Sequence, residues 1–186
     1  MLKKMIVVVA VLGLTLGGIY TYGHRSATRL PDNSPDAFLG ANRQPSGKIV
    51  VNIGDSITHG RVSYNYVDEL ARKPEFKTLT FINAGINSEL AYNVLQRLDK
   101  VIECQPDYIT LLIGTNDLSG TLNKKNGQRY VELMNLPQMP DIQWYEKNYR
   151  AVIDCLQKET DAKIAVLSLP PVTEDPNHPG YLKSKT

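Results

Sequence analysis

The feature that most constrains the fold is a series of four short apolar runs, rich in β-branched residues, with helical patterns between them. The runs are KIVVNI at 48–53, TLTFI at 78–82, YITLLI at 108–113 and KIAVLS at 163–168. Nearly continuous apolar runs of this length are typical of strands covered on both faces. The sequence therefore predicts a mainly parallel sheet between two layers of helices.

Apolar residues at spacings of three and four predict the helices, in segments 62–70, 90–102 and 145–156. Asn87 or Ser88 can cap the second helix, and Pro140 with Asp141 precedes the third. Alternating strands and helices predict right-handed crossovers and a three-layer α/β/α fold of flavodoxin-like type. The long connection 118–141 either folds over a site or is a surface insertion.

Length and charge narrow the class of protein. A chain of 186 residues with 42% hydrophobic and 22% charged residues is typical of one globular domain. Its excess positive charge comes from Lys3 and Lys4, without which 19 basic residues face 19 acidic ones. Such a balance excludes nucleic acid as the main partner, because phosphate binding needs a concentrated positive surface. Cys104 and Cys155 form no zinc motif, and a disulfide between them is permitted but not implied.

The N-terminal residues are typical of a localisation signal. Residues 1–23 predict a signal peptide or membrane anchor, in which the uncharged run Met5–Tyr22 would be about 27 Å long as a helix. Tyr20 and Tyr22 at its end, and the absence of a clean Ala-x-Ala site, favour the anchor. Residues 24–46 are rich in proline and polar residues and predict a linker before a domain at 47–186. We therefore expect an exported protein, membrane-anchored outside the cytoplasm, or secreted if the leader is cleaved.

Three motifs follow the first three predicted strands: GDSITHG at 54–60, NAGIN at 83–87 and GTND at 114–117. In an open parallel sheet, ligands bind beyond the carboxyl ends of the strands. A serine on a tight turn into a helix exposes its hydroxyl there, and a helix N-terminus favours developing negative charge. Ser56 is therefore a candidate nucleophile. The Gly85 N–H and the Asn116 amide are candidate donors to an oxyanion.

In their order and spacing these motifs resemble the SGNH, or GDSL-like, hydrolase family over residues 48–176. The resemblance implies acyl transfer to water, with Ser56 as nucleophile and its own N–H, Gly85 and Asn116 as the oxyanion hole. It implies a small-molecule ester or acyl substrate, of the carboxylesterase, lysophospholipase or thioesterase type, and no metal or cofactor.

Other interpretations of the first motif stay open. Ser56 can serve only as a helix cap, because serine is among the best capping residues. Asp55 is better suited to bracing the turn than to proton transfer. His59 lies three residues from Ser56 on the same turn, a position that rarely aims an imidazole at the hydroxyl.

The general base is the weakest part of the resemblance. Similar family members carry an Asp-x-x-His pair after a further strand, but only 18 residues follow Ser168, too few for a crossover, a strand and a loop. Asp175 and His178 have the required spacing, either as the catalytic pair or by coincidence in a proline-rich tail. The sequence leaves two hypotheses: a serine esterase, or a truncated or non-catalytic member that keeps the cleft as a binding site.

Overall fold

The computed structural model describes residues 29–41, 45, 47–61 and 63–170. Its helices and strands alternate along the chain: α2 (Pro35–Gly40), β1 (Lys48–Gly54), α3 (Ser56–His59), α4 (Tyr66–Arg72), the 3-10 helix η1 (Pro74–Phe76), β2 (Leu79–Gly85), α5 (Ala91–Leu95), α6 (Leu98–Glu103), β3 (Tyr108–Leu112), α7 (Thr115–Thr121), α8 (Lys124–Met134), α9 (Ile142–Glu159) and β4 (Lys163–Val166).

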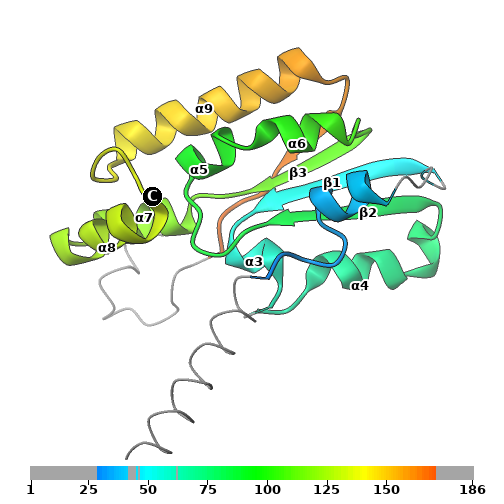
Figure 1. Ribbon diagram of the computed structural model, residues 1–186, viewed down its shortest axis with the longest axis horizontal. Helices are drawn as coiled ribbons and strands as arrows, with labels where there is room; N and C mark the ends of the chain where they lie inside the picture. The colour runs from blue at the N-terminus through cyan, green and yellow to red at the C-terminus, as the bar shows by residue number, and fades with distance from the viewer. Residues whose placement is uncertain (1–28, 42–44, 46, 62, 171–186) are drawn as a thin grey trace, which may run out of the picture.

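The four strands form one parallel sheet in the order β2-β1-β3-β4. Helices α3 and α4 lie against one face, and α5, α6 and α9 cover the other (Figure 1). This arrangement confirms the predicted three-layer α/β fold. Strand β2 lies on one side of β1, and β3 and β4 lie on the other side. The direction in which strands are added to the sheet therefore reverses at β1. The crevice beyond the carboxyl ends of β1 and β3 is thus the expected ligand site.

The core lies between the sheet and the α5, α6 and α9 layer. Its members are apolar residues of the strands and of these helices, among them Val51, Ile53, Ile82, Ile109, Leu111, Val94, Val101, Val152 and Leu156. These are the residues that the apolar runs and the helical spacings place inward. Cys104 and Cys155 are both free thiols. Burial raises the pKa of the Cys104 thiol to about 11.

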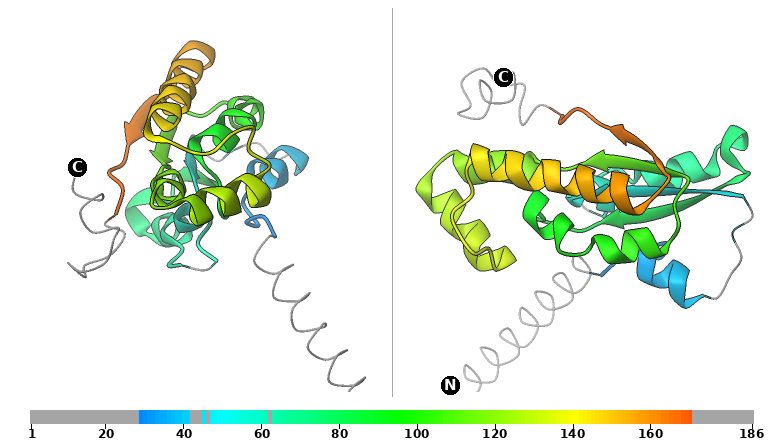
Figure 2. Two further views of the ribbon diagram at one scale, coloured as in Figure 1. Left: turned by 90° about the vertical axis from the view of Figure 1, so that its left-hand side faces the viewer. Right: turned by 90° about the horizontal axis from the view of Figure 1, so that it is seen from above.

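Strand β4 lies at the outer edge of the sheet, beside β3 (Figure 2). Unlike the other strands, it is largely exposed, with Val166 54% accessible to solvent. The apolar run at 163–168 predicted a strand covered on both faces. The strand is present, but within the described residues this cover is incomplete.

The predicted single helix over 90–102 is two helices, α5 and α6. The break falls at Arg97, whose φ of −130° and ψ of 18° leave the helical region. Neither proposed cap is used: Ser88 has a φ of 66°, and the Asp117 carboxylate accepts the Ala91 N–H at the start of α5. The start predicted for the third helix is confirmed, since Asp141 caps α9 by accepting the Trp144 N–H at 2.8 Å.

Part of the predicted linker packs on the domain. Helix α2 is tied to α6 by an Asp36–Lys100 ion pair of 3.1 Å, and the Asn33 carbonyl oxygen accepts the Asn83 N–H of β2 at 3.0 Å. The folded domain therefore includes residues before Lys48. No helix within the described ranges is long and apolar enough to cross a membrane, and the Met5–Tyr22 run lies outside those ranges.

Candidate active site

The turn between β1 and α3 brings Ser56 to the sheet edge. Gly54 permits it, because a Cβ there would lie 2.1 Å from the Thr58 Oγ1 and 2.6 Å from the Leu112 carbonyl oxygen. The Asp55 carboxylate caps α3 by accepting the Ile57 N–H at 2.9 Å. The capping interpretation of Ser56 is therefore wrong, and the bracing role of Asp55 is confirmed.

Ser56 is the first residue of α3 and is half-buried. No hydrogen bond joins its hydroxyl to another residue in the part of the chain that the structure describes. Residues in the first helical turn lack an intrahelical acceptor for their N–H. The Ser56 hydroxyl and N–H therefore both lie where a ligand at the strand ends can meet them.

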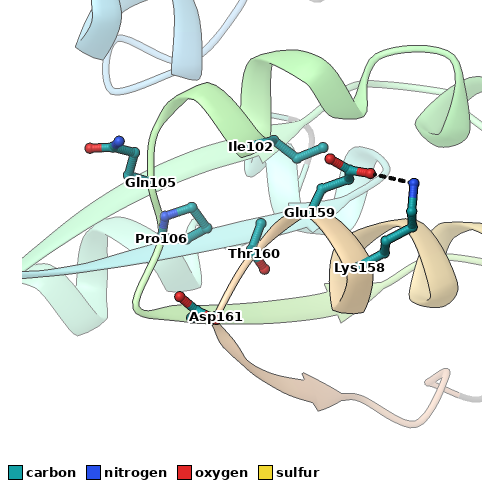
Figure 3. Close-up of a pocket in the computed structure, with 7 residues that line it drawn as sticks. All are labelled: Ile102, Gln105, Pro106, Lys158, Glu159, Thr160 and Asp161. Carbon is teal, nitrogen blue, oxygen red and sulfur yellow. Dashed lines mark hydrogen bonds and ion pairs between the residues drawn. The ribbon is translucent and has the colours of Figure 1, made fainter.

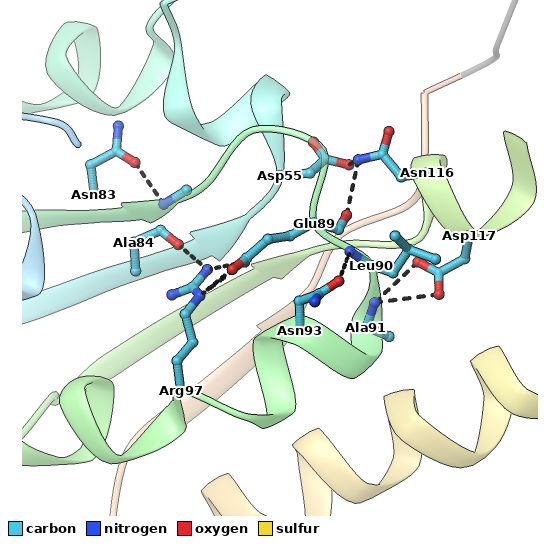
Figure 4. Close-up of polar contacts among 11 residues, drawn as sticks. Asp55, Asn83, Ala84, Glu89, Leu90, Ala91, Asn93, Arg97, Asn116 and Asp117 are labelled. Carbon is cyan, nitrogen blue, oxygen red and sulfur yellow. Dashed lines mark hydrogen bonds and ion pairs between the residues drawn. The ribbon is translucent and has the colours of Figure 1, made fainter. Parts of the chain in front are cut away.

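The Asn116 amide reaches this turn from the end of β3. Gly114 makes the approach possible, since its φ of 135° is strained for other residues and a Cβ would lie 2.7 Å from the Tyr145 hydroxyl. The Asn116 Nδ2 donates to the Glu89 carbonyl oxygen at 2.9 Å and to Asp55 Oδ2 at 3.5 Å (Figure 4). The first and third motifs thus meet at the sheet edge, as the sequence predicted.

Gly85 does not fit its predicted role as an oxyanion donor. Its N–H donates to Asn83 Oδ1 at 3.0 Å and so already has an acceptor. Gly85 is buried at the end of β2, and a Cβ there would lie 2.2 Å from the His59 backbone nitrogen. The glycine therefore allows α3 to pack directly on the sheet.

This packing role predicts that Gly85→Ala destabilises the fold by about 1–3 kcal/mol. The added methyl group would clash with backbone atoms of α3, which cannot move away by a change of rotamer. Chemical denaturation monitored by circular dichroism measures the loss. Gly40→Ala is the matched control, since a Cβ at Gly40, in α2, meets nothing within 4 Å. Equal unfolding midpoints for both variants would contradict the packing role.

The His59 imidazole is bound to a residue other than Ser56. His59 is 3% exposed, and its Nε2 donates to the Arg29 carbonyl oxygen at 2.9 Å. Burial lowers the pKa of His59 below its ordinary value. His59 is therefore not positioned as the base. Asp175 and His178 lie outside the described residues.

Sequence reasoning missed a buried ion pair next to the site. The Arg97 guanidinium donates to both carboxylate oxygens of Glu89, at 2.9 Å from its Nε, and to the Ala84 carbonyl oxygen at 2.8 Å (Figure 4). Burial raises the pKa of Glu89, and the nearby guanidinium opposes this effect. The pair holds the β2–α5 loop, which contains the strained Ser88 and the Glu89 carbonyl that binds Asn116. The sequence contains no pattern that pairs Glu89 with Arg97. The two residues come together only because the helix expected over 90–102 breaks at Arg97.

Asp117, also missed as a charged group of the site, is nearly fully buried beside Asn116. Burial raises the pKa of Asp117 to about 7, while the Ala91 N–H partly opposes this shift and the negative charge of Asp55 adds to it. The folded protein thus keeps a proton on Asp117 through a pH range in which the unfolded chain loses it.

The resulting prediction concerns stability and pH. Asp117 has an ordinary pKa of 3.8 and a raised folded value of about 7, so its stabilising contribution is present below about pH 4 and is lost as pH rises to about 7. Asp117→Asn keeps an acceptor for Ala91 but does not titrate. The free energy of unfolding of wild type relative to Asp117→Asn should therefore fall between pH 4 and 7, by an amount on the order of a few kcal/mol. Asp154→Asn, an exposed charge change on α9, should show no such trend. A pH-independent difference for Asp117→Asn would refute the assignment.

Two cavities within the described residues do not have Ser56 among their lining residues. A cavity of about 530 Å³ lies at the amino ends of β3 and β4, opposite the candidate site (Figure 3). Its lining residues are Ile102, Gln105, Pro106, Lys158, Glu159, Thr160 and Asp161. The second, of about 340 Å³, lies beside His59 and Asp68. Among the described residues, no three His, Cys, Asp or Glu side chains gather in a way that could hold a metal ion.

The fold and this strand-end site define a three-layer α/β protein with a serine turn and an amide donor at the switch point of the sheet. Residues 53–185 match the model of the GDSL-like Lipase/Acylhydrolase family. The chain belongs to this family, which confirms the resemblance inferred from its motifs. No curated protein is significantly similar to it in sequence.

Solved structures of one esterase, Axe2, agree on the fold. The acetylxylan esterase Axe2 from Geobacillus stearothermophilus is similar with a TM-score of 0.57 at 17% identity, over 76% of this chain and 69% of that one. Catalytic mutants of Axe2 carry alanine in place of a serine, an aspartate or a histidine, the last two three positions apart. The mutant lacking the aspartate gives a TM-score of 0.58 at 18% identity, over 76% and 68% of the two chains. The SGNH-hydrolase family esterase AlinE4 gives 0.49 at 20% identity, over 69% and 64%.

Proposed function

We propose that this protein is a serine ester hydrolase that cleaves small acyl esters through Ser56. One observation carries the proposal: the Asn116 amide, from the end of β3, donates at 3.5 Å to the carboxylate of Asp55, the residue directly before Ser56. This contact joins the ends of β1 and β3 at the turn that carries Ser56, whose hydroxyl has no hydrogen-bond partner among the described residues. The substrate class is a carboxylic ester or thioester, of the carboxylesterase, lysophospholipase or thioesterase type.

In this mechanism the Ser56 Oγ attacks the carbonyl carbon of the ester, and its proton passes to a general base. The carbonyl oxygen becomes an oxyanion, which accepts hydrogen bonds from the Ser56 N–H and from one Asn116 Nδ2 hydrogen. That hydrogen is available because its bond to Asp55 is long, while the other Nδ2 hydrogen stays on the Glu89 carbonyl oxygen. The alcohol or thiol leaves with the proton, and water then hydrolyses the acyl-serine.

The base is proposed as His178, oriented by Asp175. Their Asp-x-x-His spacing equals that of the aspartate and histidine replaced in the Axe2 catalytic mutants. A second candidate function is a binding protein that keeps the strand-end cleft without turnover. It is favoured by His59, whose imidazole is bound to the Arg29 carbonyl oxygen rather than to Ser56.

Hydrolysis of a chromogenic acetyl ester by the full chain separates the two functions. The esterase function requires turnover that is lost without Ser56. Loss of the same turnover in His178→Ala supports the proposed base, and turnover unaffected by that change rejects it. Binding of the intact ester with no release of chromophore supports the second function.

A further inference from the structure

The connection between β3 and α9 sends one side chain back to the candidate site. The Tyr130 hydroxyl, on α8, donates a hydrogen bond of 2.8 Å to the Asn116 Oδ1. This contact is made by the opposite end of the amide from the one that donates to Glu89 and Asp55. It connects the long 118–141 segment to the proposed oxyanion donor.

The hydrogen bonds around the Asn116 amide are complementary. The Glu89 carbonyl oxygen can only accept a hydrogen bond, and so can the Asp55 carboxylate when it is ionised. Both therefore bind the Nδ2 end of the Asn116 amide, which carries the donors. Tyr130 supplies the donor for the Oδ1 end. A donor on an amide oxygen draws electron density from the nitrogen, which makes the N–H a stronger donor because linked hydrogen bonds polarise one another.

Helix α8 is held firmly enough to position Tyr130. A Cβ on Gly127 would lie 2.5 Å from the Met139 side chain and 3.1 Å from the Gly120 carbonyl oxygen, so α8 packs closely on α7. The Tyr130 ring lies against Gly120 in this contact. At the other end of α8, the Met134 carbonyl oxygen accepts from the Asn93 side chain of α5 at 3.2 Å. The 118–141 segment is therefore packed as two helices rather than as an irregular insertion.

We propose that Tyr130 is a positioning residue for catalysis: its hydroxyl holds the Asn116 amide in place and strengthens the Nδ2 donor toward the oxyanion. The inference rests on the proposed function, but the hydrogen bond that carries it is measurable without turnover. Tyr130 touches no reacting atom and acts through Asn116.

The kinetic test is Tyr130→Phe in the full chain, with a chromogenic acetyl ester as substrate. Loss of one neutral hydrogen bond should lower kcat by about three- to tenfold and leave KM nearly unchanged. In an Asn116→Ala background the same change should have no further effect on kcat, because the group it acts through is gone. Tyr108→Phe is the matched control, since the Tyr108 hydroxyl accepts from Lys48 at the amino end of the sheet. Equal losses of kcat in both backgrounds would overturn the inference.

The structural test is the side-chain amide signal of Asn116 in a nitrogen–proton correlation spectrum, assigned by its disappearance in Asn116→Ala. This signal should shift in Tyr130→Phe and stay in place in Tyr108→Phe. An unmoved signal overturns the inference whatever the activity. If wild type is no more active than Ser56→Ala, the proposed function fails, while this spectrum still decides whether Tyr130 holds the amide.

Discussion

Ser56→Ala is expected to reduce turnover of a chromogenic acetyl ester by about 10⁴-fold or more, close to background. The hydroxyl is the proposed nucleophile, and removal of a nucleophilic serine in template hydrolases removes nearly all of the rate that depends on covalent catalysis. The residual rate comes from the oxyanion donors, which remain in the variant. Initial rates of the purified full chain and the variant, at equal concentration, measure the effect.

Labelling with a fluorophosphonate probe tests independently whether Ser56 is the nucleophile. The probe should attach to Ser56 in wild type, as identified by mass spectrometry of peptides, and should not label the variant. Ser119→Ala, on α7, is the matched control and should keep both the turnover and the labelling of wild type. Substantial turnover by Ser56→Ala, or labelling at another residue, would end the assignment of Ser56 as nucleophile.

Arg97→Leu is expected to destabilise the fold by about 3–5 kcal/mol, because it leaves the Glu89 carboxylate buried without its counter-charge. The Glu89 side chain is only 7% exposed, and Arg97 binds both of its carboxylate oxygens. Denaturant unfolding measures the free energy. Arg150→Leu is the control, because its ion pair with Glu146 is exposed and such pairs contribute about 0–1 kcal/mol.

The mechanism of that loss can be isolated with a second change. Adding Glu89→Gln to Arg97→Leu removes the unpaired charge and should restore part of the lost stability. The single variant should also lose esterase activity beyond its loss of folded protein, because the Glu89 carbonyl oxygen holds the Asn116 amide. A stability for Arg97→Leu equal to that of Arg150→Leu would show that the buried charge is not what holds the β2–α5 loop.

The sequence by itself determined the sheet and where its chemistry lies. Apolar runs of β-branched residues identified all four strands. The reason holds for β1, β2 and β3, because strands that carry the core must be apolar whatever their neighbours, while β4 is largely exposed within the described residues. The motifs of Ser56 and Asn116 followed directly from those runs, since the residues after parallel strands share one edge of the sheet. Asp141 was identified as part of the start of α9 because helix capping is a local interaction.

Only the tertiary structure decided how the groups of the site are held. Gly85 looked like a donor in a motif, but its N–H is taken by Asn83 and its missing Cβ makes room for α3. At the break between α5 and α6 the Arg97 guanidinium binds Glu89, and the cap of α5 comes from Asp117 in the first turn of α7. Tyr130 reaches Asn116 from a helix that the sequence left unassigned. The contacts of Arg97, Asp117 and Tyr130 join residues on different elements, so no local pattern encodes them, and only packing brings the partners within hydrogen-bond distance.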